Sequence, residues 1–121
     1  DTGLLFMLMH LSKIKLFSVN NLKYILYENN IANSIVSCGY NLYYYQSEGK
    51  AEVPFVIQTR TGKVIPIEIV NKNISKAKSL TLFMSKFNIS EAIRFTDDNF
   101  SLKKGIKYVP IYASFCLKEN L

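Results

Sequence analysis

The chain has 121 residues and a formal net charge of +6, from 15 lysines and arginines against nine acidic residues. About half of the residues (49%) are apolar and 13% are aromatic, which excludes a disordered chain. Five glycines and three prolines exclude collagen and proline-rich linkers. The length predicts a single domain over residues 1–121.

The sequence has no pattern for membrane insertion or secretion. Its apolar runs, such as residues 4–9, are shorter than the ~18 residues that a spanning helix needs. Asp1 stands where a secretory signal would carry basic residues. We therefore expect a cytoplasmic protein without a membrane partner, and the missing initiator methionine favours a fragment of a longer chain. Cys38 and Cys116 are expected to be reduced, buried thiols.

Hydrophobic periodicity and turn residues predict alternating helices and strands. In chain order, the expected elements are a short helix over 1–11, a helix over 21–36 that stops at Gly39, strands over 40–46, 53–59 and 64–70, a helix from about Asn73 or Ser75 to Phe87, strands over 91–96 and 107–109, and a final strand or short helix over 110–117. A crossover helix creates a parallel pair of strands. The expected fold class is α/β (α+β), with a central mixed sheet of four to five strands flanked by helices.

The helix predicted over 21–36 carries an unusually placed acidic residue. On a 3.6-residue period Ile25, Ala32, Ile35 and Val36 share one face, and Glu28 falls inside this apolar arc. Glu28 could belong to a functional site, or it could pair with a lysine or a buried backbone group. Both interpretations stay open.

Two more acidic residues lie on neighbouring strands. Glu52 shares a strand face with Pro54, and Glu68 shares one with Val70. If these faces coincide, Glu28, Glu52 and Glu68 converge as oxygen ligands for Mg²⁺, which polarises a phosphodiester and activates water. The alternatives are a surface salt bridge for Glu68 and a solvated hairpin position for Glu52.

Basic and aromatic residues suit nucleic acid. Lysines follow the Glu68 strand at Lys72, Lys76 and Lys78, and a second group is Lys103, Lys104 and Lys107. Such residues bind a phosphate backbone, although many basic domains bind nothing. Arg60 and Arg94 are the only arginines, so nothing indicates a base-reading helix. The tyrosines of residues 43–45 could stack on bases, or could simply favour a strand.

Several kinds of chemistry lack their residues. His10 is the only histidine and has no nucleophile or carboxylate at a recognisable spacing, which excludes a Ser-His-Asp or Cys-His arrangement. Two distant cysteines and one histidine do not make a zinc site. The chain has no phosphate-binding loop of the Gly-x-x-x-x-Gly-Lys-Ser/Thr type, so we expect no cofactor here except a possible Mg²⁺.

Seven motifs resemble one family in their order and spacing. They are Asp1-Thr2-Gly3-Leu4-Leu5, Tyr27-Glu28-Asn29, Leu42-Tyr43-Tyr44-Tyr45, Glu52-Val53-Pro54-Phe55, Pro66-Ile67-Glu68-Ile69-Val70, Lys78-Ser79-Leu80 and Val109-Pro110-Ile111-Tyr112. With these motifs the chain resembles the C-terminal domain of prokaryotic AAA-type ATPases known as domain of unknown function 4143. The resemblance covers essentially the whole chain and implies a C-terminal fragment of a longer ATPase, which would bind ATP elsewhere.

The resemblance further implies a restriction-endonuclease-like (PD-(D/E)xK) fold. Nucleases of that fold hold the metal with an aspartate and a glutamate and orient the attacking water with a lysine. Here the aspartate position falls on Pro54 and the lysine position on Val70, so only Glu68 and the helical Glu28 remain. Glu52 and a lysine among Lys72, Lys76 and Lys78 are the residues that could replace them.

From this pattern we expect a catalytically degenerate nuclease-like domain that acts as a nucleic-acid-binding or regulatory module. Its partners would be nucleic acid, bound without sequence preference, or the ATPase part of the same chain, with an oligomer possible. The alternatives are an active Mg²⁺-dependent endonuclease that uses displaced residues and a protein–protein assembly module. If the scaffold of the hydrolytic site that the resemblance implies is intact, Glu28 and Glu68 should lie close together.

Overall fold

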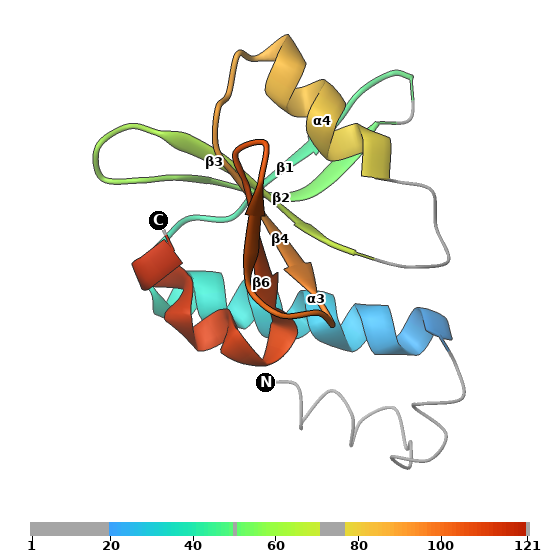
Figure 1. The fold of residues 1–121 in the computed structure, drawn as a ribbon, viewed down its shortest axis with the longest axis vertical. Coiled ribbons are helices and arrows are strands. Elements are labelled where there is room, and N and C mark those ends of the chain that lie inside the picture. Colours follow the sequence, from blue (N-terminus) through green and yellow to red (C-terminus); the bar gives the residue numbers. More distant parts are fainter. Residues whose placement is uncertain (1–19, 50, 71–76, 121) are drawn as a thin grey trace.

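The computed structural model describes residues 20–49, 51–70 and 77–120, so the helix predicted over 1–11 lies outside the described residues. The elements are α3 (Asn20–Ser37), β1 (Tyr43–Gln46), β2 (Glu52–Gln58), β3 (Val64–Ile69), α4 (Ala77–Lys86), β4 (Ala92–Thr96), β5 (Ser101–Lys103), β6 (Ile106–Pro110) and the 3-10 helix η1 (Ile111–Asn120). The strands form one sheet with α4 on one face and α3 and η1 on the other (Figure 1).

The sheet is mixed, as the alternation of elements predicts, and its strand order is β1-β2-β3-β4-β6-β5. The first three strands form the predicted antiparallel meander, and the crossover through α4 makes β3 parallel to β4. β6 is also parallel to β4. The final segment over 110–117 forms the helical alternative, within η1.

The expected strand count of four to five is wrong, because the sheet has six strands. The additional strand is β5, which forms an edge and pairs antiparallel with β6. A turn of two residues, Lys104 and Gly105, joins these strands, with φ angles of 50° and 78°. Two positive φ angles in a two-residue loop are typical of a type I′ hairpin turn. A β carbon on Gly105 would lie 2.1 Å from the carbonyl oxygen of Ser90, so this position also needs glycine for space.

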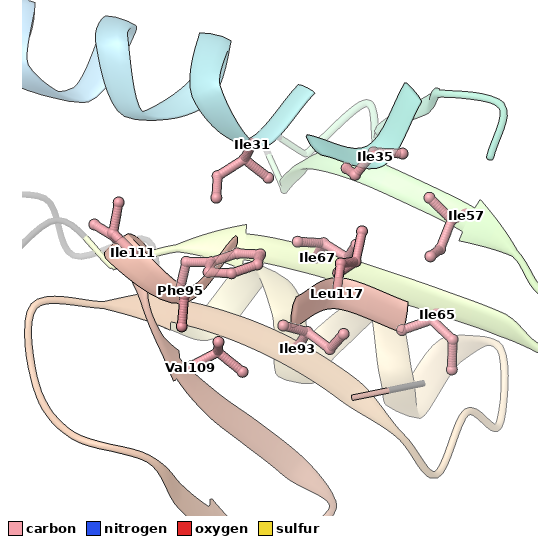
Figure 2. Close-up of a cluster of buried hydrophobic side chains, with 11 residues drawn as sticks. Ile31, Ile35, Ile57, Ile65, Ile67, Ile93, Phe95, Val109, Ile111 and Leu117 are labelled. Atoms are coloured by element: carbon pink, nitrogen blue, oxygen red, sulfur yellow. The ribbon is translucent and has the colours of Figure 1, made fainter. Parts of the chain in front are cut away.

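The larger core lies between the sheet and the layer of α3 and η1. Isoleucines alternate with other residues along β3 and point to this layer, as Figure 2 shows for Ile65 and Ile67. Ile31 and Ile35 of α3 and Leu117 of η1 meet them from the helical side. These five side chains are each no more than 2% exposed, so this core fixes which face of β3 is turned toward α3.

The buried face of α3 differs from the predicted one. Ile25 is 48% exposed and Val36 is 58% exposed, although the 3.6-residue pattern placed both on the apolar face. The residues that are buried are Leu22, Leu26, Ile31 and Ile35. These residues do not form one arc, because Leu22 and Leu26 lie about 180° around the helix from Ile31 and Ile35. Only Ile31 and Ile35 belong to the larger core against the sheet.

A smaller core lies under α4, on the opposite face of the sheet. Leu80, Phe83 and Met84 are buried there against Val53 and other strand residues. Phe87, which was predicted to point inward, is 48% exposed but still contacts the ring of Phe83 at a centroid distance of 4.8 Å. The predicted inward face of this helix is thus confirmed at Leu80, Phe83 and Met84 and incomplete at its end.

The end of α3 matches the prediction from its glycine. Gly39 has a φ angle of +84°, and its amide donates to the carbonyl of Val36 at 2.9 Å. The amide of Tyr40 donates to the carbonyl of Ile35 at 3.2 Å. These two bonds form a Schellman motif, which satisfies helix carbonyls that would otherwise lack partners.

A β-bulge interrupts β2 at Pro54. Tyr45 of β1 pairs with Val53 and Tyr43 pairs with Val56, so two residues of β2, Pro54 and Phe55, oppose the single residue between the tyrosines. A bulge tolerates proline because the ladder lacks a hydrogen bond there. The extra residue also reverses the alternation of side chains along β2, which decides where Glu52 points.

Cys38 and Cys116 are not joined by a disulfide, and both are half-buried rather than fully buried as predicted. Within the described residues, no helix combines the length and apolarity required to cross a membrane.

Candidate functional site

A row of three polar side chains crosses the α4 face of the sheet, from the end of β3 to the middle of β4 and β6. Cross-strand pairing places Glu68 of β3 beside Arg94 of β4, and Arg94 beside Tyr108 of β6. Both Nε and Nη2 of Arg94 lie 2.9 Å from Oε2 of Glu68. Nη1 of Arg94 donates to the hydroxyl of Tyr108 at 3.0 Å. We call Glu68, Arg94 and Tyr108 the polar row.

The polar row is shielded from water. Glu68 is 6% exposed and Arg94 is 8% exposed, so both charges have lost most of their hydration. In the described part of the chain, no buried side-chain nitrogen or oxygen lacks a hydrogen-bond partner. The guanidinium also lies 5.5 Å from the centre of the Tyr108 ring, a distance typical of a cation–π contact. The carboxylate of Glu68 is thus neutralised by a cation that belongs to the protein.

Pro54 and Val70 occupy the positions that the resemblance assigns to a lost aspartate and a lost lysine. The pairing of β2 with β3 runs from Gln58 beside Val64 to Phe55 beside Ile67, so Pro54, in the bulge, lies just beyond its end. The amide of Val70 donates to the carbonyl of Phe95 at 2.8 Å and extends the parallel pairing beyond the end of β3. Neither side chain brings an oxygen or a charge to the polar row.

Glu52 does not lie on the face where the sequence analysis expected it. Val53 pairs with Tyr45, whose ring packs on Phe83 of α4 at a centroid distance of 4.7 Å, so Val53 faces α4. Glu52, the next residue, points to the opposite face and accepts a hydrogen bond from the hydroxyl of Tyr44 at 3.3 Å. The condition that Glu52 faces the same side as Glu68 is not met, because the bulge shifts the alternation along β2 by one residue.

Glu28 is also separated from Glu68. It lies on the exposed side of α3, and α3 covers the face of the sheet opposite to the one that carries the polar row. Among the residues that the structure describes, no group of three or more His, Cys, Asp or Glu side chains could hold a metal ion. The structure therefore does not bring Glu28, Glu52 and Glu68 together, and the condition for their convergence on Mg²⁺ is not met.

The predicted nucleic-acid-binding lysines can be placed only in part. Lys78 is exposed on the first turn of α4, while Lys72 and Lys76 lie outside the described residues. In the second group, Lys103 is exposed and its Nζ lies 5.6 Å from the ring centre of Tyr108. Lys104 is exposed in the turn between β5 and β6. The prediction of phosphate binding stays a prediction.

The three consecutive tyrosines divide between two roles. Tyr45 contacts Phe83 and Phe87 and belongs to the packing under α4, which supports its interpretation as a strand-forming residue. Tyr43 and Tyr44 are 54% and 57% exposed on the edge strand β1. Of the three tyrosines, Tyr43 and Tyr44 are thus the two whose rings present a surface on which a base could stack.

Arg94 is the residue that sequence reasoning missed. A signal was present, because Arg94 stands in the otherwise apolar strand Ala92–Thr96, where an unpaired charge would be costly. Its partner, however, lies 26 residues earlier in the chain. The pairing follows from the parallel register of β3 and β4, which no local pattern encodes.

A family model described as "Domain of unknown function (DUF4143)" matches residues 25–114. No curated protein and no solved structure matches the chain.

Proposed function

The chain belongs to the DUF4143 family of domains of unknown function, and from this premise we propose that it is a non-cleaving module that binds nucleic acid without sequence preference. In this proposal it is the C-terminal, restriction-endonuclease-like part of a longer AAA-type ATPase, and ATP is hydrolysed elsewhere in that protein. Binding would place nucleic acid next to the ATPase part or regulate it.

The ion pair between Glu68 and Arg94 is the observation that argues against cleavage. A divalent cation needs several oxygen ligands, and Oε2 of Glu68 already lies 2.9 Å from both Nε and Nη2 of Arg94. Pro54 supplies no second carboxylate, and Val70 supplies no ammonium group to orient water. Metal binding at this point would require breaking a buried ion pair, which is strongly unfavourable.

The distribution of charge supports nucleic-acid binding. The chain has a net charge of +6, and exposed cations occur on several elements. Those that the structure describes as exposed include Arg60, Lys78, Lys103, Lys104 and Lys118. Cations scattered in this way suit the regular charge of a phosphate backbone rather than the edges of particular bases.

A second candidate function is a protein–protein assembly module. Tyr112 and Phe115 of η1 are 73% and 75% exposed, and large apolar side chains of this kind are enriched in protein interfaces. An assembly module would bury these rings and would not need nucleic acid.

A retention assay with a cleavage control tests the proposal. Labelled single- and double-stranded DNA is incubated with the chain and Mg²⁺ or Mn²⁺ at increasing ionic strength. We expect intact DNA and retention that falls steeply with salt, because bound phosphates release counterions. Cleavage that Glu68→Ala abolishes would overturn the proposal in favour of a surviving nuclease. A lack of retention even at low salt would favour the assembly module.

A restoration experiment tests the role given to Arg94. The double variant Pro54→Asp/Val70→Lys is expected not to bind Mn²⁺, because Arg94 still neutralises Glu68. Adding Arg94→Met is expected to allow binding, as measured by titration calorimetry. Binding by the double variant alone would refute the argument that Arg94 prevents metal binding. If the triple variant folds but binds no metal, the nuclease-like ancestry loses its support.

A further inference from the structure

A cavity of about 380 Å³ lies away from the polar row. It is bordered by the end of α3, the segment that leads into β1, the turn between β2 and β3, and the end of η1. Its lining includes Tyr40, Tyr43, Gln58, Arg60 and Lys118. Gln58 pairs with Val64 at the start of β3, so the cavity and Glu68 lie at opposite ends of the same strand pair.

The charged residues that line this cavity in the described part of the chain are both cations. Arg60 and Lys118 line it, and none of its lining residues is acidic. Among the described residues, neither of these cations makes an ion pair. A guanidinium and an ammonium group that share one concave surface without a carboxylate favour an anion, and phosphate in particular.

The cavity also has an aromatic side and amide groups. Tyr43 and Tyr40 are among the lining residues; Tyr43 is 54% exposed, and Tyr40 is half-buried and packs on the larger core. Asn41 and Gln58 also line the cavity, and the amide of Gln58 donates to the carbonyl of Gly62 at 3.5 Å. Exposed aromatic rings stack on nucleobases, and amides can bond to base edges. The volume lies within the range of about 300–1,000 Å³ that small-ligand sites occupy.

The backbone around the cavity is held in place from two sides. On one side, the Schellman motif at Gly39 fixes the exit from α3. On the other, the amide of Gly62 donates to the carbonyl of Thr59 at 2.9 Å, and the amide of Lys63 donates to Oγ1 of Thr59 at 3.1 Å. These bonds stabilise the turn that carries Arg60, so the cation starts from an ordered backbone.

We propose that this cavity binds a nucleoside monophosphate unit, with the phosphate on Arg60 and Lys118 and the base against Tyr43. The unit is either a free mononucleotide or one nucleotide of a single strand. In the second case the inference deepens the proposed function, because it gives nucleic acid a defined point of attachment on the domain.

A half-buried thiol in the cavity provides a direct measurement. Cys38 lines the cavity, and Cys116 does not. The chain is treated with iodoacetamide in the presence of adenosine 5′-monophosphate, inorganic phosphate, adenosine or a short oligothymidylate, and the alkylation of each cysteine is followed by mass spectrometry. We expect the monophosphate or the oligonucleotide to slow alkylation of Cys38 at least threefold and to leave Cys116 unchanged.

Matched variants test the assignment of each group. Arg60→Ala and Lys118→Ala are each expected to weaken protection at least fivefold, whereas Lys104→Ala, an exposed cation on a distant turn, leaves it unchanged. Tyr43→Leu is expected to weaken protection and Tyr43→Phe to retain it, because stacking needs the ring and not the hydroxyl. All substituted side chains are exposed, so the variants should remain folded, which melting curves would check.

Each outcome decides the inference. Protection by the monophosphate identifies a free-nucleotide site, and protection by the oligonucleotide alone identifies a strand site. The inference is overturned if inorganic phosphate at the same concentration protects Cys38 equally well, or if no ligand protects Cys38. If DNA is retained by the chain while Arg60→Ala and Lys118→Ala change nothing, the cavity assignment fails and the proposed function survives.

Discussion

The buried pair of Glu68 and Arg94 makes the strongest prediction about this protein. Arg94→Met removes the guanidinium and keeps an unbranched apolar side chain, so the buried carboxylate of Glu68 loses the ion pair that it makes at 2.9 Å. Removing one partner of a buried ion pair typically costs about 3–5 kcal/mol in the free energy of unfolding. With an unfolding entropy of about 2.1 cal/mol/K per residue, the chain of 121 residues should melt about 12–20 °C lower.

Urea denaturation followed by circular dichroism measures this loss. The double variant Glu68→Leu/Arg94→Met removes both charges and is expected to recover most of the stability, because no unpaired charge remains buried. Tyr108→Phe is a milder control that leaves one Arg94 donor without its acceptor, at a cost of about 1–3 kcal/mol. A loss below about 1 kcal/mol for Arg94→Met would refute the reasoning. A double variant as unstable as the sum of both single variants would refute it as well.

Three further predictions concern other parts of the fold. Gly105→Ala should lower the free energy of unfolding by more than about 2 kcal/mol, because a β carbon there would clash with the backbone carbonyl of Ser90. Gly62→Ala is the control and should lower it less, because Gly62 has a φ of +85° but no atom within 4 Å of the added carbon. Lys63 donates to Glu91 at 2.7 Å and lowers the pKa of Glu91 below 4.5. The stability that this ion pair contributes is therefore present above pH 4.5 and is lost as the pH falls through the lowered pKa. Lys63→Ala should reduce the melting temperature slightly at pH 7 and leave it equal to that of the wild type at pH 2. Ile67→Ala should cost about 2–5 kcal/mol by leaving a cavity in the larger core, and an unchanged melting temperature would contradict the packing described here.

Local sequence signals predicted the ends and order of elements well. Gly39 marked the end of α3 because the left-handed conformation there suits glycine, and the structure has that conformation. The helix between β3 and β4 predicted a parallel pair, since a crossover of that length brings the second strand back in the same direction. The hairpin of β5 was missed, although Lys104-Gly105 is a turn signal, because a three-residue strand has too little alternation to be recognised.

The face of a helix or strand was predicted less well than its existence. Glu28 and Ile35 are seven residues apart and lie on nearly the same side of α3, yet Ile35 packs on the larger core and Glu28, two turns earlier, is exposed. In β2, one extra residue at Pro54 reversed the direction of Glu52. Both errors have the same origin: a side chain's direction depends on the partner element and its register, which lie far away in the sequence.

By itself, the sequence determined that the chain folds as one mixed α/β unit with an excess of positive charge, because composition and periodicity are properties of neighbouring residues. The same local information showed that Pro54 and Val70 cannot bind a metal or activate water. Only the tertiary structure decided that Glu68 is neutralised by Arg94 and that Arg60 and Lys118 share a cavity. These pairs lie 26 and 58 positions apart in the chain, and they meet only because strand register and helix packing bring distant segments together.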